Sequence, residues 1–159
     1  MNHAERYLSL VEKTKGKKLY SEYQAAFYLL SSTQELYDLA LPQVSSQGIA
    51  FSEINRKIKG FDEAQAMLAS IARNLFKYET KTNASPYEIS RLGYPYMELA
   101  FNGIFIASGE AKVRTRVNDQ ELELYLDTSS YESTKRLQKQ LSRMMENGGN
   151  QEMEEDMER

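Results

Sequence analysis

Few side chains in this chain of 159 residues could carry acid–base or nucleophilic chemistry. There is no cysteine, which excludes disulfides, thiolate catalysis and cysteine-ligated metal sites. The single histidine is His3, and we expect it to be a solvated terminal residue rather than a catalytic base or a metal ligand. The remaining candidates for acid–base or magnesium chemistry are pairs of carboxylates.

The nearest carboxylate pairs occupy positions that local structure alone explains. Asp62 and Glu63 stand where a helix is predicted to begin, and Glu121 and Glu123 alternate along a predicted strand. The glycines are scattered and match neither G-x-x-x-x-G-K-[ST] nor G-x-G-x-x-G, so no phosphate-binding loop is indicated. We therefore predict a protein that is not an enzyme and uses neither a cofactor nor a metal.

Tyrosine is the residue type that suggests binding, because the chain has 11 tyrosines and no tryptophan. Tyr87, Tyr94 and Tyr96 lie around the loops expected between residues 80 and 96. Tyrosine is favoured in binding surfaces because it offers a large contact area and loses little rotamer entropy. A single tyrosine more often completes the rim of a core, but as a group these three predict a partner-binding patch.

Basic residues form two groups, and these define an alternative function. One group alternates along a predicted strand and the other recurs every four residues on one side of a predicted helix. A nucleic-acid-binding regulator of winged-helix-like architecture would use the hairpin and the last helix. Against this alternative, residues 95–109 contain no Lys or Arg to contact bases. The anion-binding residues under this alternative are Arg114, Arg116, Lys135, Lys139 and Arg143.

Polar and apolar residues alternate with period two on both sides of residues 118–120, which predicts a β-hairpin over about residues 111–127. The first arm carries only positive charge and the second only negative charge. A two-residue loop at 118–119 places Arg116 opposite Glu121 and Arg114 opposite Glu123. A four-residue loop also keeps apolar residues opposite one another. A three-residue loop does not, because a one-residue slip sends each side chain to the other face.

Elsewhere the apolar spacing predicts helices over residues 2–14, 21–40, 51–59, 61–78, 85–92, 95–109 and 129–147, with a division of the second helix near residues 31–33. Residues 95–109 are apolar almost all round, so we expect the central buried helix there. In the last helix, Leu137, Leu141 and either Met144 or Met145 are expected to face inward. The predicted fold is mainly α: a single-domain helical bundle over residues 1–147 with one C-terminal β-hairpin followed by a last helix.

Composition and charge point to a cytoplasmic protein with a distinct tail. The chain is 41% hydrophobic and 27% charged. It contains no run of 18 apolar residues, so no membrane span is predicted. The net charge is −3, with 19 bases and 17 acids in residues 1–145 but six acids and one base from Glu146 onward. We predict that residues 148–159 form a disordered acidic tail.

Several short segments resemble a group of proteins. They include Ala26-Phe27-Tyr28-Leu29-Leu30, Glu35-Leu36-Tyr37 and Arg73-Asn74-Leu75-Phe76, followed by residues 85–92 and 97–106. Over about residues 20–108 the chain resembles small, mainly helical proteins of Firmicutes bacteria and their phages. The resemblance implies an accessory protein and names no catalytic residue. The leading prediction is a non-enzymatic interaction or regulatory protein that binds another protein, with a homodimer as one version of it.

Overall fold

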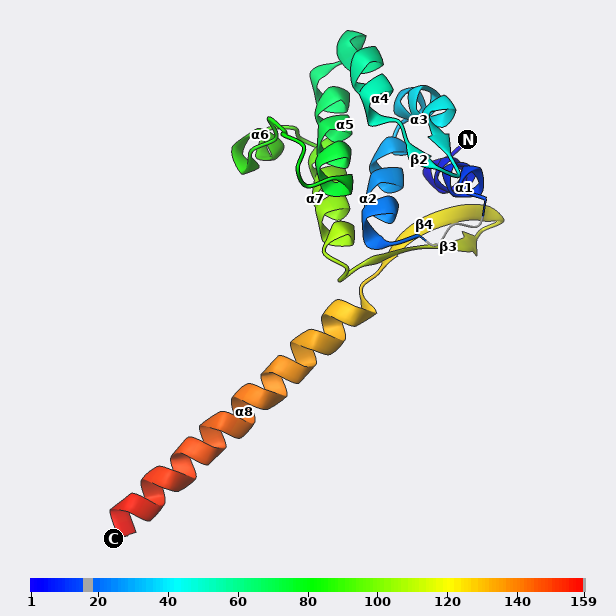
Figure 1. Cartoon of the computed structure of the whole chain (residues 1–159). Coiled ribbons are helices and arrows are strands. Elements are labelled where there is room, and N and C mark those ends of the chain that lie inside the picture. Colours follow the sequence, from blue (N-terminus) through cyan, green and yellow to red (C-terminus); the bar gives the residue numbers. More distant parts are fainter. Residues whose placement is uncertain (16–18, 159) are drawn as a thin grey trace. The chain divides into compact units, whose positions relative to one another are not determined.

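The computed structural model describes residues 1–15 and 19–158, and the side chains up to residue 149. The chain forms two compact units, Met1–Asp127 and Thr128–Arg159. As predicted, the chain is mainly helical, with a β-hairpin followed by a C-terminal helix (Figure 1). The first unit contains α1 (His3–Lys13), α2 (Ser21–Leu30), α3 (Gln34–Ala40), η1 (Leu41–Gln43), β1 (Val44–Ser45), β2 (Gly48–Ile49), α4 (Phe51–Lys57), η2 (Ile58–Gly60), α5 (Glu63–Phe76), α6 (Pro86–Ser90), α7 (Tyr96–Ala107), β3 (Lys112–Asn118) and β4 (Glu121–Asp127).

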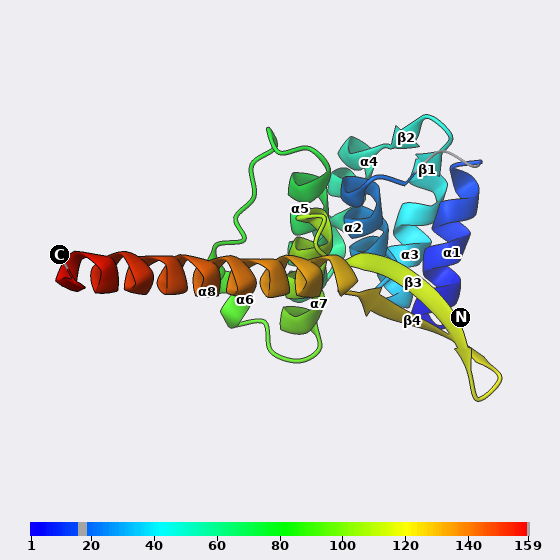
Figure 2. The ribbon, with the colours of Figure 1, turned by 90° about the horizontal axis from the view of Figure 1, so that it is seen from below.

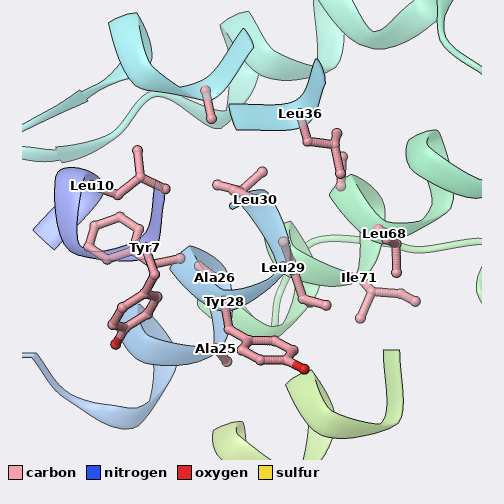
Figure 3. Close-up of a cluster of buried hydrophobic side chains, with 14 of the residues drawn as sticks. Tyr7, Leu10, Ala25, Ala26, Tyr28, Leu29, Leu30, Leu36, Leu68 and Ile71 are labelled. Carbon is pink, nitrogen blue, oxygen red and sulfur yellow. The ribbon is translucent and has the colours of Figure 1, made fainter. Parts of the chain in front are cut away.

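Helix α2 is the centre of the first unit. Seven of its ten residues are buried, and it lies between α1 on one side and α5 and α7 on the other (Figures 1 and 2). Figure 3 shows side chains of α2 gathered with those of its neighbours in the hydrophobic core. The prediction that residues 95–109 form the central buried helix is wrong. In α7 only Ala100, Gly103 and Ile106 are buried, which is a single row facing the core.

A close approach between α2 and α7 sets the distance between these helices. A Cβ atom built on Gly103 would lie 2.8 Å from Leu29 Cδ1 and 2.9 Å from Leu29 Cγ. Leu29 is fully buried, so its side chain has little space in which to move aside. One residue away, the Asn102 side-chain amide donates a hydrogen bond of 2.9 Å to the Tyr28 hydroxyl. The absence of a side chain at residue 103 therefore allows α7 to pack directly on α2.

The side chain of Arg6 joins α1 to the C-terminal end of α2. Its guanidinium donates hydrogen bonds to the carbonyl oxygens of Ser31 (2.6 Å), Ser32 (3.1 Å) and Met1 (2.6 Å). Carbonyl groups at the C-terminal end of a helix lack intrahelical partners. A cation at that end also interacts favourably with the negative end of the helix dipole. Burial lowers the pKa of the Arg6 guanidinium, while the nearby carboxylates of Asp38 and Glu5 raise it. This contact allows a helix end to be buried in the core.

Two helices begin with a capping side chain close to a predicted helix boundary. Thr33 separates α2 from α3 and accepts a hydrogen bond from the Leu36 N–H, and Asp62 caps α5 by accepting one from the Gln65 N–H. The buried Gln65 side chain links the two caps. It accepts a 2.6 Å hydrogen bond from the Thr33 hydroxyl, and its amide donates to the carboxylates of Glu35 and Asp62, both at 2.6 Å. Hydrogen bonds from Gln65 lower the pKa of Asp62.

The predicted hairpin is present, but its turn is Asp119–Gln120. These residues have φ values of 50° and 67°, the left-handed combination that a tight two-residue hairpin turn requires. Arg116 therefore pairs with Glu123, so the expected pairing of Arg116 with Glu121 is wrong by two residues. A shift by two keeps every side chain on its expected face. Val117 pairs with Leu122, so apolar residues remain opposite one another.

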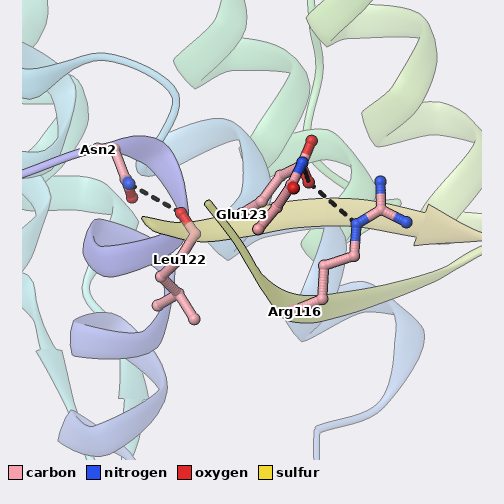
Figure 4. A network of polar contacts seen from close by, with 5 residues as sticks. Asn2, Arg116, Leu122 and Glu123 are labelled. Atoms are coloured by element: carbon pink, nitrogen blue, oxygen red, sulfur yellow. Dashed lines mark hydrogen bonds and ion pairs between the residues drawn. The ribbon is translucent and has the colours of Figure 1, made fainter. Parts of the chain in front are cut away.

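The apolar face of the hairpin packs on the helices through Val113, Leu124 and Leu126, whereas Val117, near the tip, is exposed. Two hydrogen bonds also connect the hairpin to the helical part of the unit. The Asn2 side-chain amide donates to the Leu122 carbonyl at 2.8 Å (Figure 4). The Val113 N–H donates to the Gln24 side-chain oxygen at 3.0 Å. The hairpin is thus fixed on α1 and α2, as a two-stranded sheet requires for stability.

The second unit contains the helix α8 (Ser129–Glu158). The helix continues through Gly148 and Gly149, so the expected helix end near residue 147 is not seen. A glycine lowers helix stability by about 1 kcal/mol relative to alanine but does not by itself end a helix. Leu137, Leu141, Met144 and Met145 are exposed, so the inward orientation expected for three of them is wrong. The disorder expected for residues 148–159 stays a prediction.

His3 is not the solvated terminal residue that we expected. It lies in the first turn of α1, where its ring packs on the ring of Tyr28 with centroids 4.8 Å apart. Its Nε2 atom is 2.9 Å from the Tyr28 carbonyl oxygen, to which it donates a hydrogen bond when protonated at that nitrogen. Burial lowers the pKa of His3 from 6.5 to about 4.

We predict that Gly103→Val destabilises the protein by about 2 kcal/mol or more, because the added side chain overlaps Leu29. Valine and glycine are both weak helix formers, so helix propensity contributes little to the difference. Gly60→Val is the matched control, since a Cβ atom added at Gly60 would have no other atom within 4 Å. Denaturant unfolding of both variants measures the effect, and equal stability losses would contradict the close contact.

We also predict that His3 makes the fold weaker in acid. The unfolded state, with a His pKa near 6.5, binds a proton more readily than the folded state, with a pKa of about 4. Stability should therefore fall as the pH drops from about 6.5 toward 4, and His3 should account for about 2 kcal/mol at pH 5. The measurement is the free energy of unfolding at pH 7 and pH 5 for the wild type and His3→Gln. If both proteins show the same pH dependence, the placement of His3 is wrong.

Candidate protein-binding surface

The outer side of α7 carries a row of large apolar side chains that the fold leaves uncovered. Tyr94, just before the helix, is 87% exposed, and Met97, Phe101 and Ile104 are 37%, 54% and 39% exposed. The spacing of Met97, Phe101 and Ile104, four and three residues, places these three on one side of the helix, in the d, a and d positions of a heptad, and Tyr94 lies just before the helix. We call these four residues the α7 surface.

The arrangement of α7 explains why this row faces outward. The small residues Ala100 and Gly103 face α2 and α5, together with Ile106, because only small side chains permit the close approach to Leu29. Among the larger apolar residues, Leu99 and Phe105 also pack against the core, whereas Met97, Phe101 and Ile104 lie on the outer side of the helix. Soluble monomers rarely expose contiguous apolar patches, and those that do commonly use them for binding. A row of this kind on a rigid helix is suited to contact with another apolar surface.

The three tyrosines predicted to bind a partner do not share one environment. Tyr94 and Tyr87 are both exposed, and Tyr94 belongs to the α7 surface. Tyr87 lies on α6, where the Arg91 guanidinium stands 5.7 Å from the centre of its ring. Tyr96 is partly buried and packs against the core.

Sequence reasoning missed Met97, Phe101 and Ile104, because an all-apolar helix was expected to be buried on every side. The missed signal was the pair of small residues in the middle of that helix. Ala100 and Gly103 mark the side that approaches another helix, and Met97, Phe101 and Ile104 lie on the other side.

The basic residues of the hairpin have acidic partners on the neighbouring strand. Arg116 Nε lies 3.0 Å from the Glu123 carboxylate (Figure 4), and Arg114 Nε lies 3.4 Å from that of Asp127. The Arg116 guanidinium also stands 4.7 Å from the centre of the Tyr125 ring. Hydrogen bonds from Arg116 and Asn118 lower the pKa of Glu123. These contacts use the arginine charges within the hairpin itself.

The basic residues of α8 share one side of that helix, as their spacing predicted. Lys135, Lys139 and Arg143 lie there together with Gln138, Ser142 and Glu146. All six side chains are exposed. This part of α8 is therefore a solvated surface whose charge is predominantly positive.

Among the described side chains, in residues 1–15 and 19–149, no group of three His, Asp or Glu residues could hold a metal ion. No helix in the same ranges is both long and apolar enough to cross a bilayer.

The chain matches no protein-family model, no curated protein and no solved structure. The resemblance to proteins of Firmicutes bacteria and their phages therefore stays an expectation.

We predict that the α7 surface contributes little to folding. The triple variant Met97→Gln, Phe101→Gln and Ile104→Gln should lose no more than about 1 kcal/mol of stability, because surface substitutions have small effects. It should also bind less of a dye that reports exposed apolar surface, such as anilinonaphthalene sulfonate. Ile106→Gln, at a fully buried position of the same helix, is the control and should lose about 3 kcal/mol or more. A triple variant that unfolds like Ile106→Gln would show that the row belongs to the core.

Proposed function

We propose that this protein is a non-enzymatic interaction or regulatory module that binds another protein through the α7 surface. The observation that supports this proposal most strongly is the exposure of Tyr94, Met97, Phe101 and Ile104 in one row on a well-packed helix. Aromatic residues and methionine are enriched where proteins bind one another. In this proposal the protein is a cytoplasmic accessory protein of a bacterium or a phage.

The chemistry of α7 favours a protein partner over a nucleic acid. The helix contains no Lys or Arg, and its one charged residue is Glu98. A phosphate backbone requires positive charge, and base recognition requires polar side chains that reach into a groove. The α7 surface offers neither, whereas an apolar row suits a partner that buries its own apolar side chains.

The alternative function is a nucleic-acid-binding regulator that uses the hairpin and α8. The observation that favours it is the group of Lys135, Lys139 and Arg143 on one side of α8. The ion pairs of Arg114 and Arg116 within the hairpin weaken it, because binding a phosphate would require these contacts to break. A nucleic-acid binder should elute from heparin at a salt concentration that rises with the number of phosphate contacts.

Affinity capture from the native cell tests the proposal. The wild-type protein should retain a specific protein identified by mass spectrometry, and the retention should survive nuclease treatment. The triple glutamine variant of the α7 surface should lose that protein while keeping its fold. A capture that nuclease abolishes, or that the triple variant retains in full, would contradict the proposal. In that case, loss of capture in Lys135→Gln, Lys139→Gln, Arg143→Gln would support the nucleic-acid alternative.

A further inference from the structure

We propose that the partner covers the α7 surface with an amphipathic helix that carries Lys or Arg beside its own apolar row. This inference rests on the proposed function and specifies the chemistry of the partner. It follows from the shape of the row, from the charge beside it and from the poor fit of a second copy of α7.

The shape of the row fits a single helix. From Met97 to Ile104 its helical part extends over about 10 Å, at the helical rise of about 1.5 Å per residue. Apolar residues restricted to a and d positions form a narrow seam, into which one helix packs at a crossing angle of about 20°. Interfaces between globular proteins typically bury about 800 Å² on each side. The α7 surface has only four side chains, and two of them are less than half exposed, so its area is smaller than that of a typical interface. An area of this smaller size can be covered by one helix.

Glu98 supplies the charge beside this seam. It follows Met97 directly, is exposed, and is the one charged residue within Tyr96–Ala107. It takes no part in the ion pairs found among the described side chains, residues 1–15 and 19–149. In heptad terms it occupies an e position, where charged residues of paired helices meet. A helix docked on the α7 surface would reduce the hydration of this carboxylate, and a cation on that helix would offset the loss.

A second α7 helix lying antiparallel fits poorly. The register that pairs the helical residues of the row sets Met97 against Phe101 of the second copy. The two-fold axis then passes level with Leu99, and the two Glu98 carboxylates face each other within about one helical residue of that axis. Like charges at such a position oppose association. A heterologous helix with Lys or Arg at that level has the opposite, favourable interaction.

Two synthetic helical peptides test the inference against the full-length protein. Both carry leucine at every a and d position; one has lysine at the e and g positions and the other has glutamate there. Sedimentation should first confirm that each peptide is monomeric at the working concentration. Fluorescence anisotropy at low salt should show the lysine peptide binding at least about fivefold more tightly than the glutamate peptide.

Two variants provide the controls. Glu98→Gln should bind both peptides with similar affinity, and Glu98→Lys should prefer the glutamate peptide. The triple glutamine variant of the α7 surface should bind neither peptide.

Three results would overturn the inference: equal affinity of the wild type for both peptides, binding to neither, or self-association of the wild type that the triple variant loses in light scattering. The first result leaves the proposed function intact, because that function is judged by protein capture from the native cell.

Discussion

The burial of α2 on nearly all sides is the constraint on which the rest of the first unit depends. A buried helix end must satisfy its carbonyl groups, and the Arg6 guanidinium does so for Ser31 and Ser32. The neighbouring helices must also pack closely on a buried helix, and Gly103 allows α7 to approach α2 in this way. Because α7 turns Ala100 and Gly103 toward the core, Met97, Phe101 and Ile104 lie on its outer side. The binding surface that we propose is therefore a direct consequence of core packing.

The charged residues of the hairpin serve a structural purpose under the same account. Arg116 forms an ion pair with Glu123 and Arg114 forms one with Asp127, so the basic residues of one strand are paired with acidic residues of the other. Exposed ion pairs of this kind add little stability, but like charges in a wrong register would repel one another. They help to define how the strands align. The hairpin as a whole contributes Val113, Leu124 and Leu126 to the edge of the core.

The sequence allowed the prediction of features that depend on local chemistry. Three helices begin close to the predicted boundaries, at Thr33, Asp62 and Ser85, where a side-chain acceptor satisfies a free N–H. The hairpin followed from alternation of apolar residues. Its turn was misplaced, because Asn118–Asp119 and Asp119–Gln120 are both polar and only the backbone reveals the left-handed pair.

Features set by contacts distant in sequence were not predicted. The side of α7 that faces the core depends on how Gly103 fits Leu29 in another helix, and no local pattern contains that information. Arg6 and His3 were likewise placed by contacts with residues 25 or more positions away. The most direct test of the proposed binding surface is maleimide labelling of Phe101→Cys, which is the only cysteine of that variant because the natural chain has none. The labelling rate is compared between the purified protein and the native cell. Tyr78→Cys serves as the exposed reference and Ile106→Cys as the buried one. We expect Phe101→Cys to react nearly as fast as the Tyr78→Cys reference when purified, and to be protected in the cell, where a partner covers it. Slow labelling in both settings, or equally fast labelling in both, would contradict the account.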